Sequence, residues 1–214
     1  MGAIQQFMEE GGPFMYIIAF VGVIALAIMI ERFIFLFFKF NINANAFMAQ
    51  VQKLVMANNI DRAIKLCNAA VNAALPKVIK AGLTRANKGE IEIHNAIEEA
   101  SLEVLPVIQK RTNSLVALAQ IATYLGLLGT IFGMIQAFEA VANAAPEQKA
   151  TALAAAISIA MNTTAFGLIV GIPCMAVHLF LSNITNKIIQ EIDQYSVKLE
   201  NLLVSRGRGT TLDK

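Results

Sequence analysis

The sequence predicts an all-α integral membrane protein with three transmembrane helices. Of its 214 residues, 57% are hydrophobic and 15% are charged, and the mean hydropathy is +0.60, whereas a soluble domain has about 45–50% apolar and about 25% charged residues. The apolar residues form three runs, each longer than the ~18 residues that indicate a membrane span. A net charge of +2 without a basic block argues against nucleic acid as a partner.

The three runs define predicted spans over residues 14–38, 115–140 and 152–181. Each can cross a hydrocarbon core of about 30 Å at about 1.5 Å per residue. Segment 1–13 has no Lys or Arg, and the first run is too long for the apolar core of a signal peptide, so we expect this run to stay in place as a span. The Glu31-Arg32 pair near its end is expected to form an interfacial ion pair or to snorkel.

Basic residues predict the orientation. Residues 39–114 hold ten Lys and Arg and residues 182–214 hold five, of 17 in the chain. Residues 1–13 hold none and residues 141–151 hold one. By the positive-inside rule, the N-terminus and the short loop face outward, while the long segment and the C-terminal helix and tail face the cytoplasm.

Four helices are expected in the long cytoplasmic segment, because apolar residues recur there at spacings of three and four. These apolar residues are Phe47, Val51, Leu54 and Val55, then Ile64, Cys67 and Val71, then Val78, Ile79 and Leu83, and finally Ile97, Leu102 and Leu105. Asn59 or Asp61 can cap the second helix, and Pro76 can start the third, which residues 87–89 end. If the fourth continues unbroken from residue 90 to residue 140, Pro106 should kink it.

Small residues predict tight packing of the second and third spans. The glycines lie on one helical stripe in each span, at spacings that let two helices approach closely. They are Gly126, Gly129 and Gly133 in the second span, and Gly167 and Gly171, followed by Pro173, in the third. Pro173 predicts a bend with a released carbonyl.

Polar residues inside these spans are the candidate ion pathway: Thr130 in the second span and Asn162, Thr163 and Thr164 in the third. Counted from the outer ends of the spans, Thr130 and Thr164 lie ~15 and ~18 Å deep, at similar levels. Hydroxyls at one level could stabilise a cation or a protonated carboxyl in a helical oligomer. Because Glu139 lies near a span end, proton conduction would need an acid from another subunit.

Isolated residues give no support for an enzyme. Cys67 and Cys174 have no CxxC or Cys/His spacing, and His94 and His178 have no second ligand three or four residues away. Phosphate-binding loops and catalytic triads are also missing from the sequence. We therefore expect no catalytic residues, no metal and no cofactor.

Two motifs resemble the MotA/TolQ/ExbB family of proton-channel subunits, most closely its three-span ExbB and TolQ members. LGLLGTIFGMIQAF at residues 125–138 is similar to the family's second-span signature, and TTAFGLIVGIP at residues 163–173 to its third-span signature. The likeness extends more weakly to the Glu31-Arg32 pair and to the helix at residues 61–67.

The resemblance implies a bacterial inner-membrane pentamer around two copies of an ExbD/TolR-like single-span protein, whose transmembrane Asp carries the proton. Thr130 and Thr164 match the threonines that line the family's ion path. The ion would be H⁺ or Na⁺, since hydroxyls can serve either. Inward flow would drive work on a periplasmic or outer-membrane component, through a TonB/TolA-like protein, for transport, envelope maintenance or motility.

Two positions depart from the family pattern. Thr123 stands where a proline is usual, and Ile159 stands where ExbB and TolQ usually carry a glutamate. The first change affects a kink and the second removes a carboxylate, so a gliding, secretion or other motor relative is an alternative to the ExbB or TolQ branch. A rival from another class is a non-conducting membrane scaffold, in which the glycines and threonines only pack helices.

Overall fold

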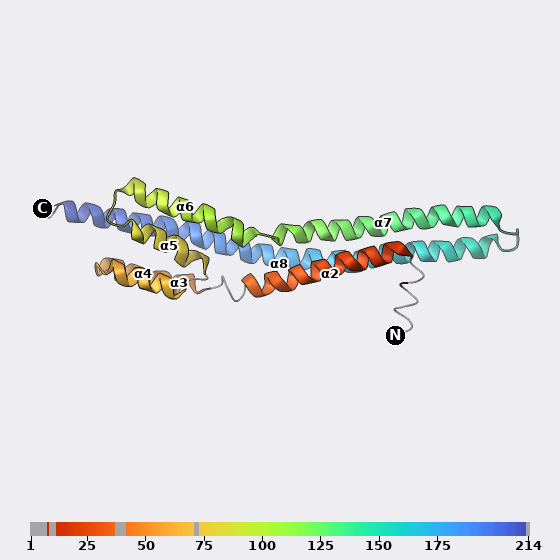
Figure 1. Ribbon diagram of the computed structural model, residues 1–214, viewed down its shortest axis with the longest axis horizontal. Coiled ribbons are helices and arrows are strands. Elements are labelled where there is room, and N and C mark those ends of the chain that lie inside the picture. The colour runs from red at the N-terminus through yellow and green to blue at the C-terminus, as the bar shows by residue number, and fades with distance from the viewer. Residues whose placement is uncertain (1–7, 9–11, 37–41, 71–72, 213–214) are drawn as a thin grey trace. The chain divides into compact units, whose positions relative to one another are not determined.

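The computed structural model describes residues 8, 12–36, 42–70 and 73–212, with side chains up to residue 206. Every regular element in this part of the chain is a helix, and Figure 1 shows their course. The helices are α2 (Pro13–Ile34), α3 (Ala44–Met56), α4 (Ile60–Ala69), α5 (Ala74–Thr84), α6 (Glu90–Gln109), α7 (Thr112–Asn143) and α8 (Lys149–Leu212). Phe38 and Val71, which belong to predicted helices, lie outside the described residues.

Three segments are long and apolar enough to cross a membrane: Pro13–Ile34, Glu90–Asn143 and Lys149–Arg206. Only 22–28% of their most apolar stretches is buried within the chain. Most of this apolar surface therefore needs cover from lipid or from other chains. The predicted all-helical membrane fold with three candidate spans is confirmed.

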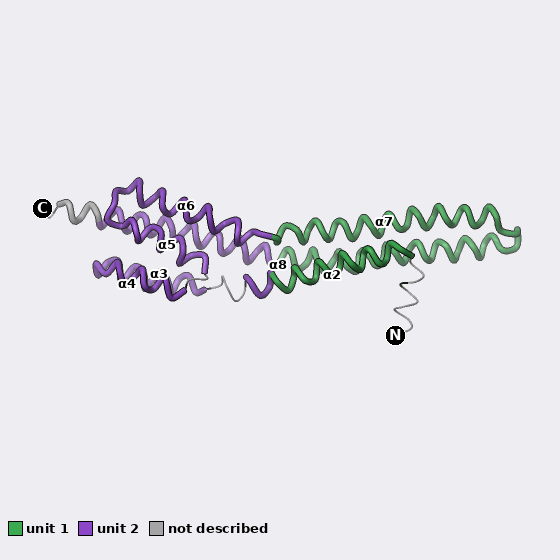
Figure 2. The backbone as a smooth tube through the Cα atoms, in the orientation of Figure 1, with its two compact units in different colours: residues 1–31, 111–180 green, residues 32–110, 181–214 purple. Residues whose placement is uncertain are grey.

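The chain divides into two compact units, coloured separately in Figure 2. Unit 1 comprises Met1–Glu31 and Arg111–Phe180, and unit 2 comprises Arg32–Lys110 and Leu181–Lys214. Helix α8 contributes to both units without a break, and it continues through Pro173.

Unit 1 is built on an antiparallel hairpin of α7 and the first part of α8, against which α2 packs (Figure 1). Ala25 of α2 shares a buried cluster with Ala119 of α7 and Cys174 of α8. The rings of Phe14 and Phe132 lie 5.2 Å apart. Ala25, Ala119 and Cys174 are small, so they let the three helices approach closely. Small contact residues are expected in a membrane, where the hydrophobic effect cannot drive helix association.

An unbroken helix over residues 90–140, which was the condition for a kink at Pro106, does not form, because this stretch is divided between α6 and α7. Pro106 lies near the end of α6, and the Lys110 N–H donates to the Pro106 carbonyl at 2.9 Å. Arg111 then takes a left-handed conformation at φ 62°, which costs about 1–2 kcal/mol for a non-glycine residue. The perturbation at Pro106 is thus followed by the end of the helix and not by a kink within it.

Glu31 pairs with a different arginine from the one predicted. Its carboxylate accepts a hydrogen bond of 2.6 Å from Arg111 Nη1, whereas the buried Arg32 has its guanidinium 5.1 Å from the centre of the Phe35 ring. Adjacent residues of a helix point in different directions, so Glu31 and Arg32 cannot face each other. The Glu31–Arg111 pair ties the end of α2 to the start of α7.

Unit 2 packs α3 to α6 with the C-terminal part of α8. A Cβ at Gly82 of α5 would lie 2.8 Å from the Ile97 side chain and 3.0 Å from that of Leu199, so α5, α6 and α8 meet there. The Tyr195 hydroxyl donates to the side-chain amide oxygen of Asn45, which joins α8 to α3. Apolar burial and polar bonds together hold this bundle.

The residues predicted to cap or start helices in unit 2 lie at or near the starts of α4 and α5, but their local contacts differ from the prediction. Asn59 is the N-cap of α4, yet its side chain makes no capping bond and donates instead to the Ala57 carbonyl at 3.2 Å. Helix α5 starts at Ala74, two residues before Pro76. The first turn of a helix lacks internal N–H partners, so it can hold a proline there.

Two ionisable side chains of unit 2 have shifted pKa values. The hydrogen bond from His94 Nδ1 to Glu200 at 3.1 Å, which links α6 to α8, raises the pKa of His94 above its usual value. Burial raises the pKa of the Cys67 thiol to about 11, against a smaller opposing effect of Lys80. Cys67 is therefore a protonated, packing thiol at neutral pH.

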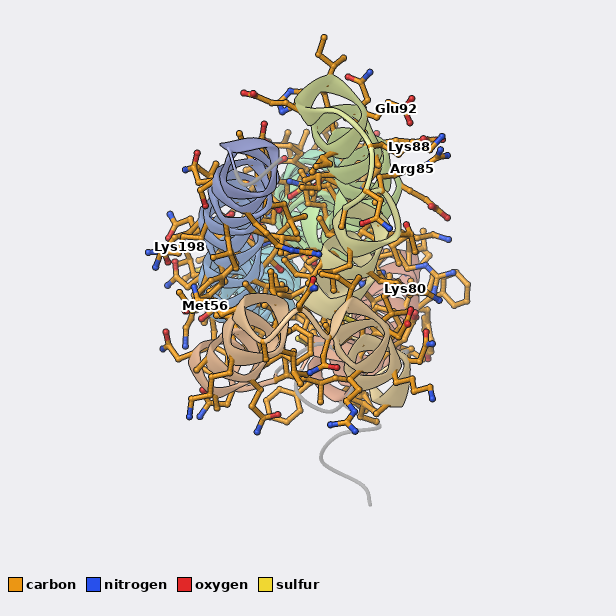
Figure 3. All side chains as sticks on the ribbon, turned by 90° about the vertical axis from the view of Figure 1, so that its left-hand side faces the viewer. Met56, Lys80, Arg85, Lys88, Glu92 and Lys198 are labelled. Atoms are coloured by element: carbon orange, nitrogen blue, oxygen red, sulfur yellow. The ribbon has the colours of Figure 1, made fainter. Side chains whose placement is uncertain are left out.

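Charged side chains meet where α5 gives way to α6. Arg85 and Lys88 each lie 3.6 Å from Glu92, and Figure 3 shows the three side chains together on one side of the bundle. All three are more than half exposed, so these pairs contribute little to stability.

Candidate functional site: the hydroxyl pair of α7 and α8

The candidate site lies on the seam between α7 and α8, which small residues line on both sides. At the buried positions of α7 stand Ala119, Ala122, Gly126, Gly129 and Ala137. Their counterparts on α8 include Ala160, Gly167 and Gly171, all buried. Small residues allow backbone-to-backbone contact, which brings short hydroxyl side chains within reach of the facing helix.

The glycines of the seam have no room for a side chain. A Cβ at Gly126 would lie 3.0 Å from the Thr163 carbonyl oxygen and 3.2 Å from the Gly167 Cα. One at Gly133 would lie 2.7 Å from the Ala160 Cβ. Even an alanine side chain would force the helices apart at these points. The glycines thus make the close contact that the predicted packing stripe requires.

The hydroxyls of Thr130 and Thr164 meet across this seam. They hydrogen bond to each other, and Thr164 Oγ1 lies 3.1 Å from the Gly126 carbonyl oxygen. Thr130 Oγ1 lies 3.2 Å from that same oxygen and 3.2 Å from the Ala160 carbonyl oxygen. The two side chains, predicted to lie at one depth, thus form a direct pair beside two carbonyl acceptors.

Both hydroxyls are only partly buried, so the pair is accessible from the flank of the seam. Each hydroxyl has one proton and can also accept. Either Thr164 donates to Thr130, which donates to a carbonyl, or Thr130 donates to Thr164, which donates to the Gly126 carbonyl. The pair therefore has two hydrogen-bond directions and can present either a donor or an acceptor to a third group.

The other two predicted pathway residues lie differently. Thr163 is 2% exposed, and its hydroxyl donates to the Ala160 carbonyl of its own helix at 2.7 Å. It also fills the space beside Gly129, where a Cβ would lie 2.7 Å from Thr163 Oγ1. Asn162 is half-buried, and no described residue hydrogen bonds to its amide. The structure brings Thr163 to the seam beside the pair, and leaves Asn162 outside this hydrogen-bonded group.

Sequence reasoning missed two polar contacts in the same hairpin. Thr123 Oγ1 donates to the Ala119 carbonyl at 3.0 Å and faces Gly171, where a Cβ would lie 2.7 Å away. His178 Nδ1 lies 3.0 Å from the Thr112 carbonyl oxygen. Thr123 lies seven residues from Thr130 on α7, and His178 lies seven residues from Gly171 on α8. This spacing is the sequence signal for both residues, and it becomes informative once the register of α7 and α8 is known.

Carboxylates are absent from the middle of the hairpin, since Glu139 and Glu147, near its turn, are the ones that residues 112–180 contain. Among the described residues, no group of three His, Cys, Asp or Glu side chains could hold a metal ion. The chemistry that this site offers is hydroxyl and carbonyl hydrogen bonding within a membrane-spanning hairpin.

Three apolar helices with a hydroxyl pair on a glycine-lined seam define a small multi-span membrane protein with polar groups inside its spans. Residues 70–194 match the sequence model of the MotA/TolQ/ExbB proton channel family. This match covers more than half of the chain and includes α7 and the part of α8 that lines the seam. The protein belongs to the MotA/TolQ/ExbB proton channel family.

Individual relatives agree with this membership. The chain is 25% identical to an ExbB homologue of Methanothermobacter thermautotrophicus over 194 residues, which cover 90% of this chain and 67% of the relative. It is 28% identical to an ExbB-like biopolymer transport protein of Synechocystis over 152 residues, 70% of each chain. In fold it is similar to a solved C. jejuni MotAB structure, with a TM-score of 0.52, 18% identity and coverage of 86% of this chain and 80% of that one.

Proposed function

We propose that this chain is the channel subunit of an ion-driven motor in the cytoplasmic membrane. In this proposal the proton motive force moves ions along the α7–α8 seam, and a partner converts that movement into mechanical work on a periplasmic or outer-membrane component. The observation that carries the proposal is the Thr130–Thr164 hydroxyl pair beside the Gly126 and Ala160 carbonyls. Membership of a proton channel family supports it.

The chemistry of the pair fits a partner that supplies an acid. A protonated carboxyl needs an acceptor and a carboxylate needs a donor, and the two hydrogen-bond directions of the pair can meet each in turn. Hydroxyls themselves do not ionise near neutral pH, and the middle of the hairpin has no carboxylate. The acid would come from a single-span ExbD/TolR-like protein with an Asp in its span.

The proposed assembly is a ring of about five copies of this chain around about two copies of that partner. The poorly buried apolar faces of the three spans leave ample surface for contacts between copies and with lipid. The proposed orientation places residues 1–13 and 141–151 outside and residues 39–114 and 182–214 in the cytoplasm, from the distribution of Lys and Arg. The ion is H⁺ in this proposal, with Na⁺ as the alternative.

A non-conducting scaffold is the second candidate, and the closeness of the glycine contacts favours it. In that case the Thr130 and Thr164 hydroxyls would only satisfy each other and the nearby carbonyls. The two functions differ in composition, because a scaffold needs no acid-bearing partner.

The experiment is to isolate the tagged full-length chain from its native membrane in mild detergent, and to determine the mass and composition of the complex. The proposal expects about five copies together with about two copies of a single-span protein that has an Asp or Glu within its span. A homo-oligomer that lacks such a protein, after extraction in several mild detergents and in polymer-bounded native membrane, would favour the scaffold.

A further inference from the structure

Polar groups continue along the hairpin from the hydroxyl pair toward the end where α7 begins. Thr123 is seven residues from Thr130 on α7, and His178 is fourteen residues from Thr164 on α8, with Gly171 halfway. Seven residues are nearly two helical turns, so such positions share one side of a helix with a drift of about 20°. The three levels are about 10 Å apart along the hairpin at about 1.5 Å per residue.

Contacts between α7 and α8 show that these levels face each other across the seam. Thr130 meets Thr164, Thr123 faces Gly171, and Thr112 meets His178. A side chain at position 171 would strike Thr123 Oγ1 at 2.7 Å, so the missing side chain of Gly171 makes room for this hydroxyl. Among the described residues, Thr123 hydrogen bonds to the Ala119 carbonyl of its own helix and to no other group, which leaves its oxygen able to accept a further hydrogen bond.

His178 is held in a defined tautomer. A carbonyl oxygen can only accept, so the contact with the Thr112 carbonyl requires a proton on His178 Nδ1. In the neutral ring, Nε2 then has the free lone pair, and this nitrogen can take up a proton and release it again. His178 is half-buried, so the ring is not sealed in the interior.

A second observation points to the same place. Thr112 is 3% exposed, and its Oγ1 has no hydrogen-bond partner among the described residues. A buried hydroxyl of this kind usually binds a water molecule. The residue whose carbonyl fixes the His178 ring therefore also offers an unused site for water.

We infer that Thr123 and His178 extend the ion path of this protein from the Thr130–Thr164 pair to the end of the hairpin where α7 starts, with His178 Nε2 as the proton acceptor at that end. This inference rests on the proposed function. Thr123, Thr130, Thr164 and His178 are all only partly buried, so water on the flank of the seam bridges the gaps of about 10 Å between levels. Each hydroxyl accepts a hydrogen bond and passes on its own proton, so none of them ionises.

At the last step, a protonated water on the path transfers its proton to the Nε2 lone pair and gives an imidazolium. The Nε2–H bond then breaks and returns the proton to the water next to Nε2, at the end of the hairpin where α7 starts. Nδ1 keeps its proton throughout, hydrogen bonded to the Thr112 carbonyl oxygen. Charged groups at this end of unit 1 are Arg111 on α7 and Glu31 on α2, which pair with each other. His178 is the titratable side chain on the described path itself.

Proton flux through the native complex, reconstituted in liposomes with an internal pH dye, tests this inference. Thr123→Val keeps the shape of the side chain but removes the hydroxyl, while T123S retains it. His178→Gln can still donate to the Thr112 carbonyl but cannot carry a proton. His94→Gln in unit 2 is the matched histidine control, and size-exclusion profiles check the assembly of each complex.

We expect a loss of proton flux in T123V and H178Q, and flux near that of the wild type in T123S and H94Q. Wild-type flux in both T123V and H178Q, with flux lost in T164V, would overturn the inference and leave the proposed function standing. If H178Q fails to assemble, equal flux in T123V and T123S overturns it. A wild-type complex with flux no higher than empty liposomes would contradict the proposed function itself.

Discussion

Gly133→Ala tests how closely α7 and α8 approach. The added Cβ would lie 2.7 Å from the Ala160 Cβ and 3.1 Å from the Ala160 Cα. Carbon atoms in favourable contact are about 3.5–4.0 Å apart, so the helices would have to separate by about 1 Å. Such overpacking costs about 1–3 kcal/mol, and the better helix propensity of alanine returns up to about 1 kcal/mol. We expect a net loss of about 1–2 kcal/mol in the free energy of unfolding.

The assay is reversible unfolding in mixed micelles, followed by circular dichroism, for the wild type, G133A, A160G and the double variant. Removing the Ala160 Cβ takes away the nearest clashing atom, so the two substitutions should couple favourably by about 1 kcal/mol. Strictly additive effects, or a G133A protein as stable as the wild type, would refute the close approach at this level of the seam.

Gly126 provides the matched contrast. Around its added Cβ, the nearest atoms belong to backbone, namely the Thr163 carbonyl oxygen at 3.0 Å and the Gly167 Cα at 3.2 Å. No side-chain deletion on α8 can relieve that clash. We therefore expect Gly126→Ala to destabilise the hairpin without rescue by any single facing substitution.

Three further predictions concern the ends of the hairpin and unit 2. Arg111→Ala should be about 1 kcal/mol less stable than R111G in the same unfolding assay. Both variants lose the pair with Glu31, but only glycine accepts the positive φ of 62° without strain. Equal stabilities of the two variants would contradict the left-handed conformation of Arg111. The hydrogen bond to Glu200 raises the pKa of His94, so the stabilising effect of this bond is complete below about pH 6.5 and is lost as the pH rises through the raised pKa. His94→Gln should therefore flatten this part of the profile of melting temperature against pH. An unchanged profile in H94Q would argue against the hydrogen bond. Cys67, with a pKa of about 11, should react with iodoacetamide at pH 8 about 100-fold more slowly than an exposed thiol with the ordinary pKa of 9.0. The measurement uses a variant whose other cysteine is replaced by alanine, and rapid reaction would show that the Cys67 thiol is not buried.

Local sequence patterns were sufficient for the spans and for the small-residue seam. A helix repeats every 3.6 residues, so glycines at spacings of three and four necessarily share a face, and Gly126, Gly129 and Gly133 do line the contact with α8. Counting from the ends of the spans placed Thr130 and Thr164 at similar depths, because two antiparallel helices joined by a short loop have a nearly fixed register.

Contacts that depend on rotation about the helix axes could not be predicted in this way. The pairing of Glu31 with Arg111 spans 80 residues, and the left-handed Arg111 has no local sequence signal, since arginine has no preference for positive φ. Thr123 was noted only as a departure from the family's proline. Its hydroxyl bonds to the Ala119 carbonyl, the same group that a proline at position 123 would deprive of its backbone donor.

The most direct test of the central claim measures energy coupling in the native host. It compares the Thr164→Val variant with T164S and T163V. The Thr164 hydroxyl bonds to Thr130 and to the Gly126 carbonyl, and a side-chain hydrogen bond of this kind in a membrane contributes about 0.6 and at most about 1.7 kcal/mol, so T164V should still assemble. We predict that coupling is abolished in T164V, retained in T164S, and largely retained in T163V, whose hydroxyl is buried against its own helix. Full coupling in an assembled T164V complex would contradict the claim that the hydroxyl pair carries the ion.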